Sequence, residues 1–118
     1  MNPPLHGITV LDLSHMAAGP FCSMIMADMG AEVIKIEIPG TGDGLRTWGP
    51  PFLGKEGVYF LYLNRGKKSM TLNLKDTEGK HIFLELARRA QVLLENFVPG
   101  TMEKLGLGPE EVMTINPQ

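Results

Sequence analysis

The residues with the clearest chemical potential lie where apolar segments of the sequence end. An apolar run at residues 8–13 is followed by Ala17, Ala18 and Gly19, just before a helical pattern begins. Small side chains at the carboxyl end of a strand let a flat or extended ligand approach the backbone closely. They would equally allow a tight turn between a strand and a helix, and the residues alone favour neither interpretation.

Several polar side chains occupy similar positions. Lys75 lies where a predicted strand meets a predicted helix, so it could hold a phosphate or be an ordinary surface lysine. Asn96 directly follows an apolar strand, and its amide suits a ligand or a loop-fixing hydrogen bond equally well. The cations Arg65, Lys67 and Lys68 could bind phosphates, but such a cluster more often forms a solvated turn, which is the interpretation we favour.

The sequence contains no complete catalytic constellation. Cys22 lies near a predicted helix N-terminus, which favours a thiolate, but no histidine is paired with it, so we expect a buried structural cysteine. His15 stands at a strand end without an acidic neighbour, and Asp12 is expected to cap or pair locally. The glycine-rich residues 40–44 match no nucleotide-binding fingerprint, so we expect a plain flexible loop there. No cysteine or histidine cluster indicates a metal site.

Composition points to one ordinary folded domain. The 118 residues are 43% hydrophobic and 20% charged, and the net charge of −2 argues against nucleic-acid binding. A single cysteine excludes an intrachain disulfide and fits a reducing compartment. Without a secretory signal or a long apolar run in this sequence, we expect a cytoplasmic protein that does not enter a membrane.

Strand and helix patterns alternate along the sequence. Strands are predicted at residues 8–13, 32–38, 69–74 and 91–95, and helices at 21–29, after Asp76, at 101–105 and from Pro109. Residues 39–57 read as a loop, and residues 58–63 as a short helix or a strand. This alternation predicts an α/β fold with parallel strands, whose carboxyl ends form the expected ligand-binding edge.

Two long segments resemble a known family. The segment "GITVLDLSHMAAGPFCSMIMADMGAEVIKIEIPGTGDGLRTWGPPF" is similar to the opening of class III CoA-transferases, which include formyl-CoA transferase, carnitine CoA-transferase and 2-methylacyl-CoA racemase. The segment "LNRGKKSMTLNLKDTEGKHIFLELARRAQVLLENFVPGTMEKLGLG" continues the match, so the resemblance extends from about Gly7 to the last residue.

The resemblance implies a Rossmann-like parallel sheet with flanking helices, of which residues 1–118 would be the incomplete N-terminal part. It also implies coenzyme A as acyl-CoA substrate, a carboxylic acid as second substrate, an interlocked homodimer and no metal. The transferases of this family transfer CoA between carboxylic acids through an aspartate nucleophile that forms acyl-anhydride and aspartyl-CoA intermediates. That aspartate would follow the present sequence, so we expect no catalytic residue and no turnover in this chain alone.

The resemblance implies CoA contacts at the ends of the predicted strands, where Ala17, Ala18, Lys75 and Asn96 were already selected from the residues. These contacts match Ala17, Ala18, Leu72, Asn73, Leu74, Lys75, Asn96 and Phe97, and Lys104 stands where the family has an arginine. Lysine keeps the positive charge of arginine but lacks its planar guanidinium group, which can donate two parallel hydrogen bonds. Ile38 replaces a second family arginine, which lies near the CoA nucleotide; Lys75 or the cations at residues 65–68 could compensate.

Two other functions stay open at this stage. The chain could belong to a 2-methylacyl-CoA racemase, although the loop at residues 40–52 favours a transferase. It could instead be a non-catalytic domain that binds a nucleotide or a partner protein. A titration with CoA separates the binding of coenzyme from the binding of a partner.

Overall fold

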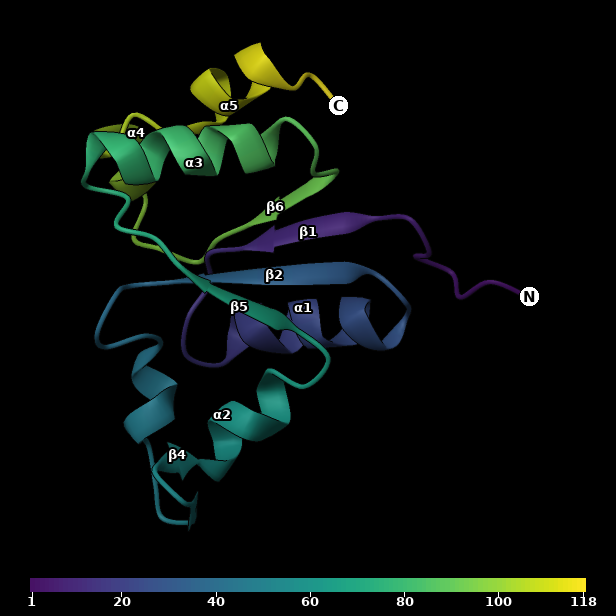
Figure 1. Cartoon of the computed structure of the whole chain (residues 1–118), viewed down its shortest axis with the longest axis vertical. Coiled ribbons are helices and arrows are strands. Elements are labelled where there is room, and N and C mark those ends of the chain that lie inside the picture. The colour runs from purple at the N-terminus through teal and green to yellow at the C-terminus, as the bar shows by residue number, and fades with distance from the viewer.

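Four parallel strands lie between two layers of helices in the computed structural model, which describes all residues from 1 to 118 (Figure 1). In chain order the elements are β1 (Thr9–Asp12), α1 (Ala18–Asp28), β2 (Glu32–Glu37), η1 (Gly44–Thr47), β3 (Phe52–Leu53), β4 (Glu56–Gly57), α2 (Val58–Leu63), β5 (Lys68–Thr71), α3 (Thr77–Ala87), β6 (Val92–Leu94), α4 (Thr101–Lys104) and α5 (Pro109–Ile115).

The main sheet has the strand order β5-β2-β1-β6, and every neighbouring pair is parallel. In the central strand β1, Val10 lies opposite Val33 of β2 and Val92 of β6. All four carboxyl ends therefore face one edge of the sheet. The predicted α/β fold with a parallel sheet is confirmed.

Helices lie on both sides of the sheet, and α2 packs on α1 and η1. Helices α3, α4 and α5 lie on one side, and α1 and α2 on the other (Figure 1). Successive strand residues point to opposite faces, so Leu11 joins the cluster around Phe83 of α3, whereas Val10 packs with Ala31 and Val33 on the α1 side. This burial on both faces explains why the strand sequences are almost continuously apolar.

Helix ends differ modestly from the sequence prediction. Helix α1 begins at Ala18 rather than at residue 21, and Pro20 occupies its first turn, where the missing N–H costs no hydrogen bond. Residues 58–63, for which helix and strand were both possible, form helix α2. Asp76 is the N-cap residue of α3, although its side chain makes no capping hydrogen bond.

Two sequence predictions are wrong. Residues 39–57 are not a loop throughout, since they contain η1 and the antiparallel pair β3–β4. Residues 40–44 within this segment, predicted to be a plain flexible loop, include Asp43, whose side chain caps η1 by accepting from Leu45 N. Cys22 is exposed rather than buried, because α1 turns its neighbours Ser23 and Met24 toward the interior.

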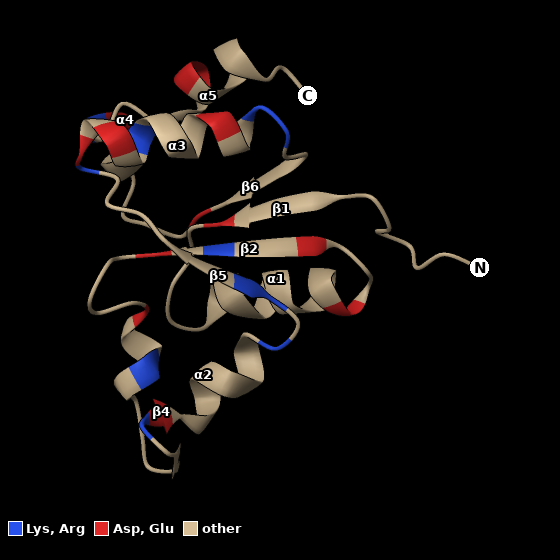
Figure 2. Cartoon of the chain, viewed as in Figure 1, with Lys and Arg blue, Asp and Glu red and all other residues tan.

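Charged residues of both signs are interspersed along the chain, with a lysine inside β2 and an acidic residue at its start (Figure 2). None of the helices has the length and hydropathy that a membrane crossing requires.

Candidate functional site

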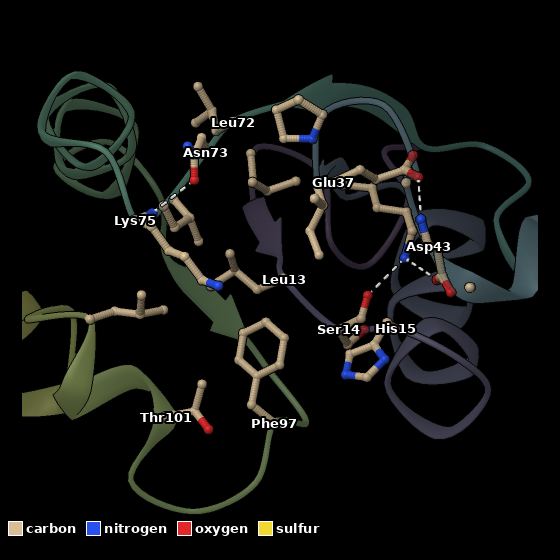
Figure 3. Close-up of a pocket in the computed structure, with 18 residues that line it drawn as sticks. Leu13, Ser14, His15, Glu37, Asp43, Leu72, Asn73, Lys75, Phe97 and Thr101 are labelled. Carbon is tan, nitrogen blue, oxygen red and sulfur yellow. Dashed lines mark hydrogen bonds and ion pairs between the residues drawn. The ribbon is translucent and has the colours of Figure 1, made fainter.

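A cleft of about 510 Å³ opens at the carboxyl edge of the main sheet. Its walls come from the segments that follow β1, β2, β5 and β6, so one cavity spans all four strand ends. Figure 3 shows Ser14, His15 and Asp43 on one side, Leu72, Asn73 and Lys75 on the other, with Phe97 between them. The lining residues are 13–15, 35–39, 42–44, 72–75, 97, 101 and 105.

The cleft brings together most, but not all, of the residues selected from the sequence. Leu72, Asn73, Leu74, Lys75 and Phe97 line it. The other four selected residues, Ala17, Ala18, Asn96 and Lys104, are exposed and do not contribute to its lining.

Lys75 carries the cation in the cleft that is free to meet a ligand. Its backbone N–H donates to Asn73 Oδ1 at 3.1 Å, which fixes the turn before α3, while its amine takes part in no ion pair. The other lysine of the lining, Lys35, is buried and paired. An anionic group in the cleft would therefore meet its positive charge at Lys75.

Asn96 fixes a loop. Its Oδ1 accepts from His15 N at 3.0 Å, and its Nδ2 donates to His15 O at 2.8 Å. The next residue, Phe97, places its ring 5.4 Å from the His15 ring. These contacts join the segment after β6 to the segment after β1, so the loop-fixing interpretation accounts for Asn96.

Gly19 is small because the turn is tight. A Cβ at this position would lie 2.2 Å from Ser14 Cβ and 3.4 Å from Asn96 Cγ. The tight-turn interpretation therefore accounts for Gly19, whereas Ala17 and Ala18 are exposed small residues that a ligand can approach.

A buried ion pair supports the same side of the cleft. Lys35 Nζ lies 2.9 Å from Asp43 Oδ2, and each side chain is 1% exposed. The same amine donates to the backbone oxygen of Ser14 at 2.8 Å. Sequence reasoning missed both residues as part of the site; the available signal was a lysine inside the apolar strand at residues 32–37.

Glu37 lies beside this pair and accepts four hydrogen bonds. The donors are Asp43 N at 2.9 Å, Arg46 Nε at 2.8 Å, Arg46 Nη2 at 2.7 Å and Ser69 Oγ at 2.8 Å. Burial alone would raise the pKa of Glu37, but the bonds from Arg46, Asp43 and Ser69 lower it to about 2. The same pairing raises the pKa of Arg46 above its usual value. Glu37 is therefore a structural anion.

A second buried pair lies under the start of α1. Lys67 Nζ lies 3.0 Å from Asp12 Oδ2 and also donates to Pro20 O at 3.0 Å and to Asn64 Oδ1 at 2.8 Å. Asp12 also accepts locally from Ser14, as expected, and from Ser23. The prediction of a solvated basic turn is therefore wrong for Lys67.

Burial and charge act in opposite directions on this pair. Burial would raise the pKa of Asp12, but the bonds from Ser14 and Ser23 and the charges of Lys67 and Lys35 lower it below its ordinary value. Burial lowers the pKa of Lys67, and the attraction of Asp12 only partly offsets that effect. The Asp12 carboxylate is committed to these bonds, which leaves it unsuited to nucleophilic attack.

The cleft can bind an elongated ligand that has apolar and anionic parts, because it combines apolar walls with one free cation. Its buried carboxylates, Glu37 and Asp43, are both ion-paired, so neither is a free base. Ile38 is 67% exposed at the rim and offers an apolar surface. No group of three or more histidine, cysteine, aspartate or glutamate side chains is arranged to hold a metal ion.

Comparison with known proteins gives consistent matches. The sequence profile of CoA-transferase family III matches residues 5–118. Succinyl-CoA:glutarate CoA-transferase from Homo sapiens is 52% identical over 114 residues, which cover 97% of this chain and 26% of that protein. Acetyl-CoA:oxalate CoA-transferase from Acetobacter aceti is 51% identical over 115 residues, covering 98% and 29%.

A solved structure shows the same fold. The crystal structure of a CAIB/BAIF family protein from Brucella suis superposes with a TM-score of 0.93 at 42% identity, covering 100% of this chain and 32% of that one. The chain thus spans less than a third of the length of these proteins.

Proposed function

The chain belongs to CoA-transferase family III, and we propose that it forms the coenzyme A-binding part of an enzyme that transfers CoA between carboxylic acids. The observation that carries this proposal is the cleft that spans the carboxyl ends of all four parallel strands. Ligands of open α/β sheets bind at this edge. The segments 72–75 and 97, selected from the sequence as CoA contacts, contribute to one cavity there.

Each part of the coenzyme has a suitable surface in this proposal. Lys75 binds a phosphate, because its amine is exposed and unpaired at the cleft. Leu72, Leu74 and Phe97 contact the less polar pantetheine chain. Ala17 and Ala18 are exposed and have small side chains, so the ligand can approach the chain closely there. Lys104 lies outside the lining and would contact the ligand only where the ligand leaves the cleft.

We also propose how the chemistry is divided. A carboxylate nucleophile attacks the carbonyl of the acyl-CoA thioester and displaces CoA as its thiolate, which leaves a mixed anhydride on the enzyme. The thiolate then attacks the enzyme carbonyl of that anhydride, so that the donor acid leaves as its carboxylate and the enzyme carries CoA as a thioester. The resemblance implies that this aspartate lies outside the 118 residues, so in this proposal these residues bind and orient CoA and the chain alone does not turn over. Transfer of CoA by the 118-residue chain at an ordinary enzymatic rate would contradict this division.

The second substrate is a carboxylic acid. The relatives named above use glutarate and oxalate, which favours a small dicarboxylic acid here. Assembly as a homodimer and a cytoplasmic location belong to the same proposal.

Binding of CoA to the chain tests the proposal directly. We expect calorimetry to detect saturable binding and CoA to raise the melting temperature. Lys75→Ala should weaken binding about 5- to 10-fold, because a lost contact between a cation and a phosphate costs on the order of 1 kcal/mol. Lys55→Ala, an exposed lysine in the turn between β3 and β4, is the matched control and should change nothing.

The alternative is a domain that binds a partner protein. It is favoured by exposed apolar side chains on and near α2, namely Trp48, Phe52, Leu53, Tyr59 and Tyr62. Absence of both heat and stabilisation at millimolar CoA would support this alternative and remove the coenzyme proposal.

A further inference from the structure

The loop after β1 contains the one non-glycine residue with a left-handed backbone. Met16 has φ 63°, in the segment between Ser14 and the start of α1. Residues other than glycine rarely adopt a left-handed backbone conformation, because the Cβ atom is crowded there. They keep it only where the surrounding structure holds them. Ser14 and His15, which precede Met16, line the cleft, so the strained position directly follows the wall of the proposed coenzyme site.

Three side chains from distant parts of the sequence hold this loop. Lys35 of β2 donates to Ser14 O at 2.8 Å, Asn96 bonds both backbone groups of His15, and Asp43 Oδ1 accepts from Met16 N at 3.0 Å. Three consecutive backbone positions are therefore fixed by side chains from outside the loop. We call Lys35, Asp43 and Asn96 the loop clamp.

Asp43 is the centre of the loop clamp. Besides Met16, its Oδ1 accepts from Leu45 N at 2.9 Å, and its Oδ2 lies 2.9 Å from Lys35 Nζ. Its own backbone N–H donates to Glu37 Oε2 at 2.9 Å. Asp43 thus couples the segment after β2 to the segment after β1, and its position is itself fixed.

Stability alone gives a poor account of this arrangement. The attraction within a buried ion pair offsets little more than the free-energy cost of desolvating its two charges, so the pair adds little to stability. What the pair does provide is a fixed geometry for the backbone that it contacts. A binding loop that is already ordered loses little conformational entropy when the ligand binds, so the free energy of binding is more favourable.

We propose that Asp43 is a positioning residue that, together with Lys35 and Asn96, holds the loop after β1 in its coenzyme-binding conformation. The effect on CoA affinity rests on the proposed function. The effect on the loop conformation is independent of that function, and the experiment below measures affinity and conformation separately.

The key experiment compares Asp43→Ala with the double variant Asp43→Ala/Met16→Gly in the 118-residue chain. Glycine adopts positive φ without strain, so it should restore the loop when Asp43 no longer holds Met16. Amide hydrogen exchange of His15 reports the conformation, because the partner of that amide is Asn96 and not the substituted residue. Calorimetric titration with CoA reports affinity.

We expect Asp43→Ala to increase the exchange rate of the His15 amide at least tenfold and to weaken CoA binding about tenfold. The added Met16→Gly substitution should recover a substantial part of both losses. Asp43→Asn keeps an acceptor for Met16 N but presents an amide to Lys35, so it should lie between the parent and Asp43→Ala. Asp28→Asn, an exposed residue of α1 paired with Arg65, is the matched control and should leave both measurements within twofold of the parent.

The outcomes separate the two proposals. Unchanged His15 exchange in Asp43→Ala, or no recovery with Met16→Gly, would overturn the loop clamp. Faster His15 exchange that Met16→Gly reverses, in a chain that binds no CoA, would support the clamp and contradict the proposed function. If Asp43→Ala does not fold, the same comparison made with Asp43→Asn and Asp43→Asn/Met16→Gly decides the question.

Discussion

At the scale of single residues, the Gly19 position gives the sharpest prediction. Gly19→Ala would place a Cβ 2.2 Å from Ser14 Cβ, and both residues are buried at the turn into α1. We expect a loss of about 1–3 kcal/mol in the free energy of unfolding, as is usual when an atom is added to a packed interior. Urea denaturation measures this loss.

Gly44→Ala is the matched control for that substitution. Its added Cβ would meet only Met16 Sδ at 3.6 Å, an ordinary contact, so its effect should stay within about 0.5 kcal/mol. Equal losses for the two variants would show that the turn relaxes around a side chain at position 19. In that case the small residues at the start of α1 would need another explanation, such as the approach of a ligand.

Single residues also show where sequence reasoning reaches its limit. Lys75 and Phe97 could be selected because strand ends define the ligand edge. The partner of Lys35 could not be predicted, although its place inside an apolar strand was a signal, because Asp43 belongs to a segment without strong periodicity. Lys67 has the same difficulty, since Asp12 is 55 positions away in the sequence. Pairing over such separations follows from the tertiary fold rather than from local pattern.

At the scale of elements, the buried Asp12–Lys67 pair connects β1, α1 and the turn before β5. Lys67→Met removes the cation that faces Asp12 Oδ2 and the donor to Pro20 O in α1. Loss of one partner leaves a buried charge uncompensated, so we expect a destabilisation of about 3–5 kcal/mol in urea denaturation.

Arg65→Met is the control for this prediction, because Arg65 forms an exposed pair with Asp28. An exposed pair contributes little, and this variant should lose less than about 1 kcal/mol. The double variant Asp12→Asn/Lys67→Met should be more stable than Lys67→Met, since it removes the unpaired charge. Equal effects of Lys67→Met and Arg65→Met would mean that the buried pair does not hold the elements together.

The elements with strong periodicity were predictable and the irregular ones were not. The apolar runs at β1 and β2 and the stripe on α3 identified their types, because burial on a sheet or helix face imposes those periods. Residues 39–57 are held by side-chain contacts that leave no periodic pattern of apolar residues in the sequence. Arg46 pairs with Glu37 and Glu56, and its guanidinium lies 3.9 Å from the centre of the Phe60 ring.

At the scale of the whole molecule, buried carboxylates control stability in acid. The pKa of Glu37 is lowered from an ordinary 4.5 to about 2, and that of Asp12 is also lowered. A lowered pKa in the folded state means that the unfolded chain binds protons first as the pH falls. The stability that Glu37 contributes is therefore fully present above about pH 4.5 and is lost progressively as the pH falls toward 2.

Glu37→Gln tests this dependence across the whole fold. At pH 7 the variant should be less stable than the parent by an amount on the order of 3 kcal/mol, because it lacks the charged bonds to Arg46. Its stability should then fall less steeply between pH 4.5 and pH 2, so the two curves approach each other in acid. Glu110→Gln, an exposed residue of α5, should leave the parent curve unchanged. Curves for Glu37→Gln and the parent that stay parallel down to pH 2 would show that Glu37 is not a charged anchor of the fold.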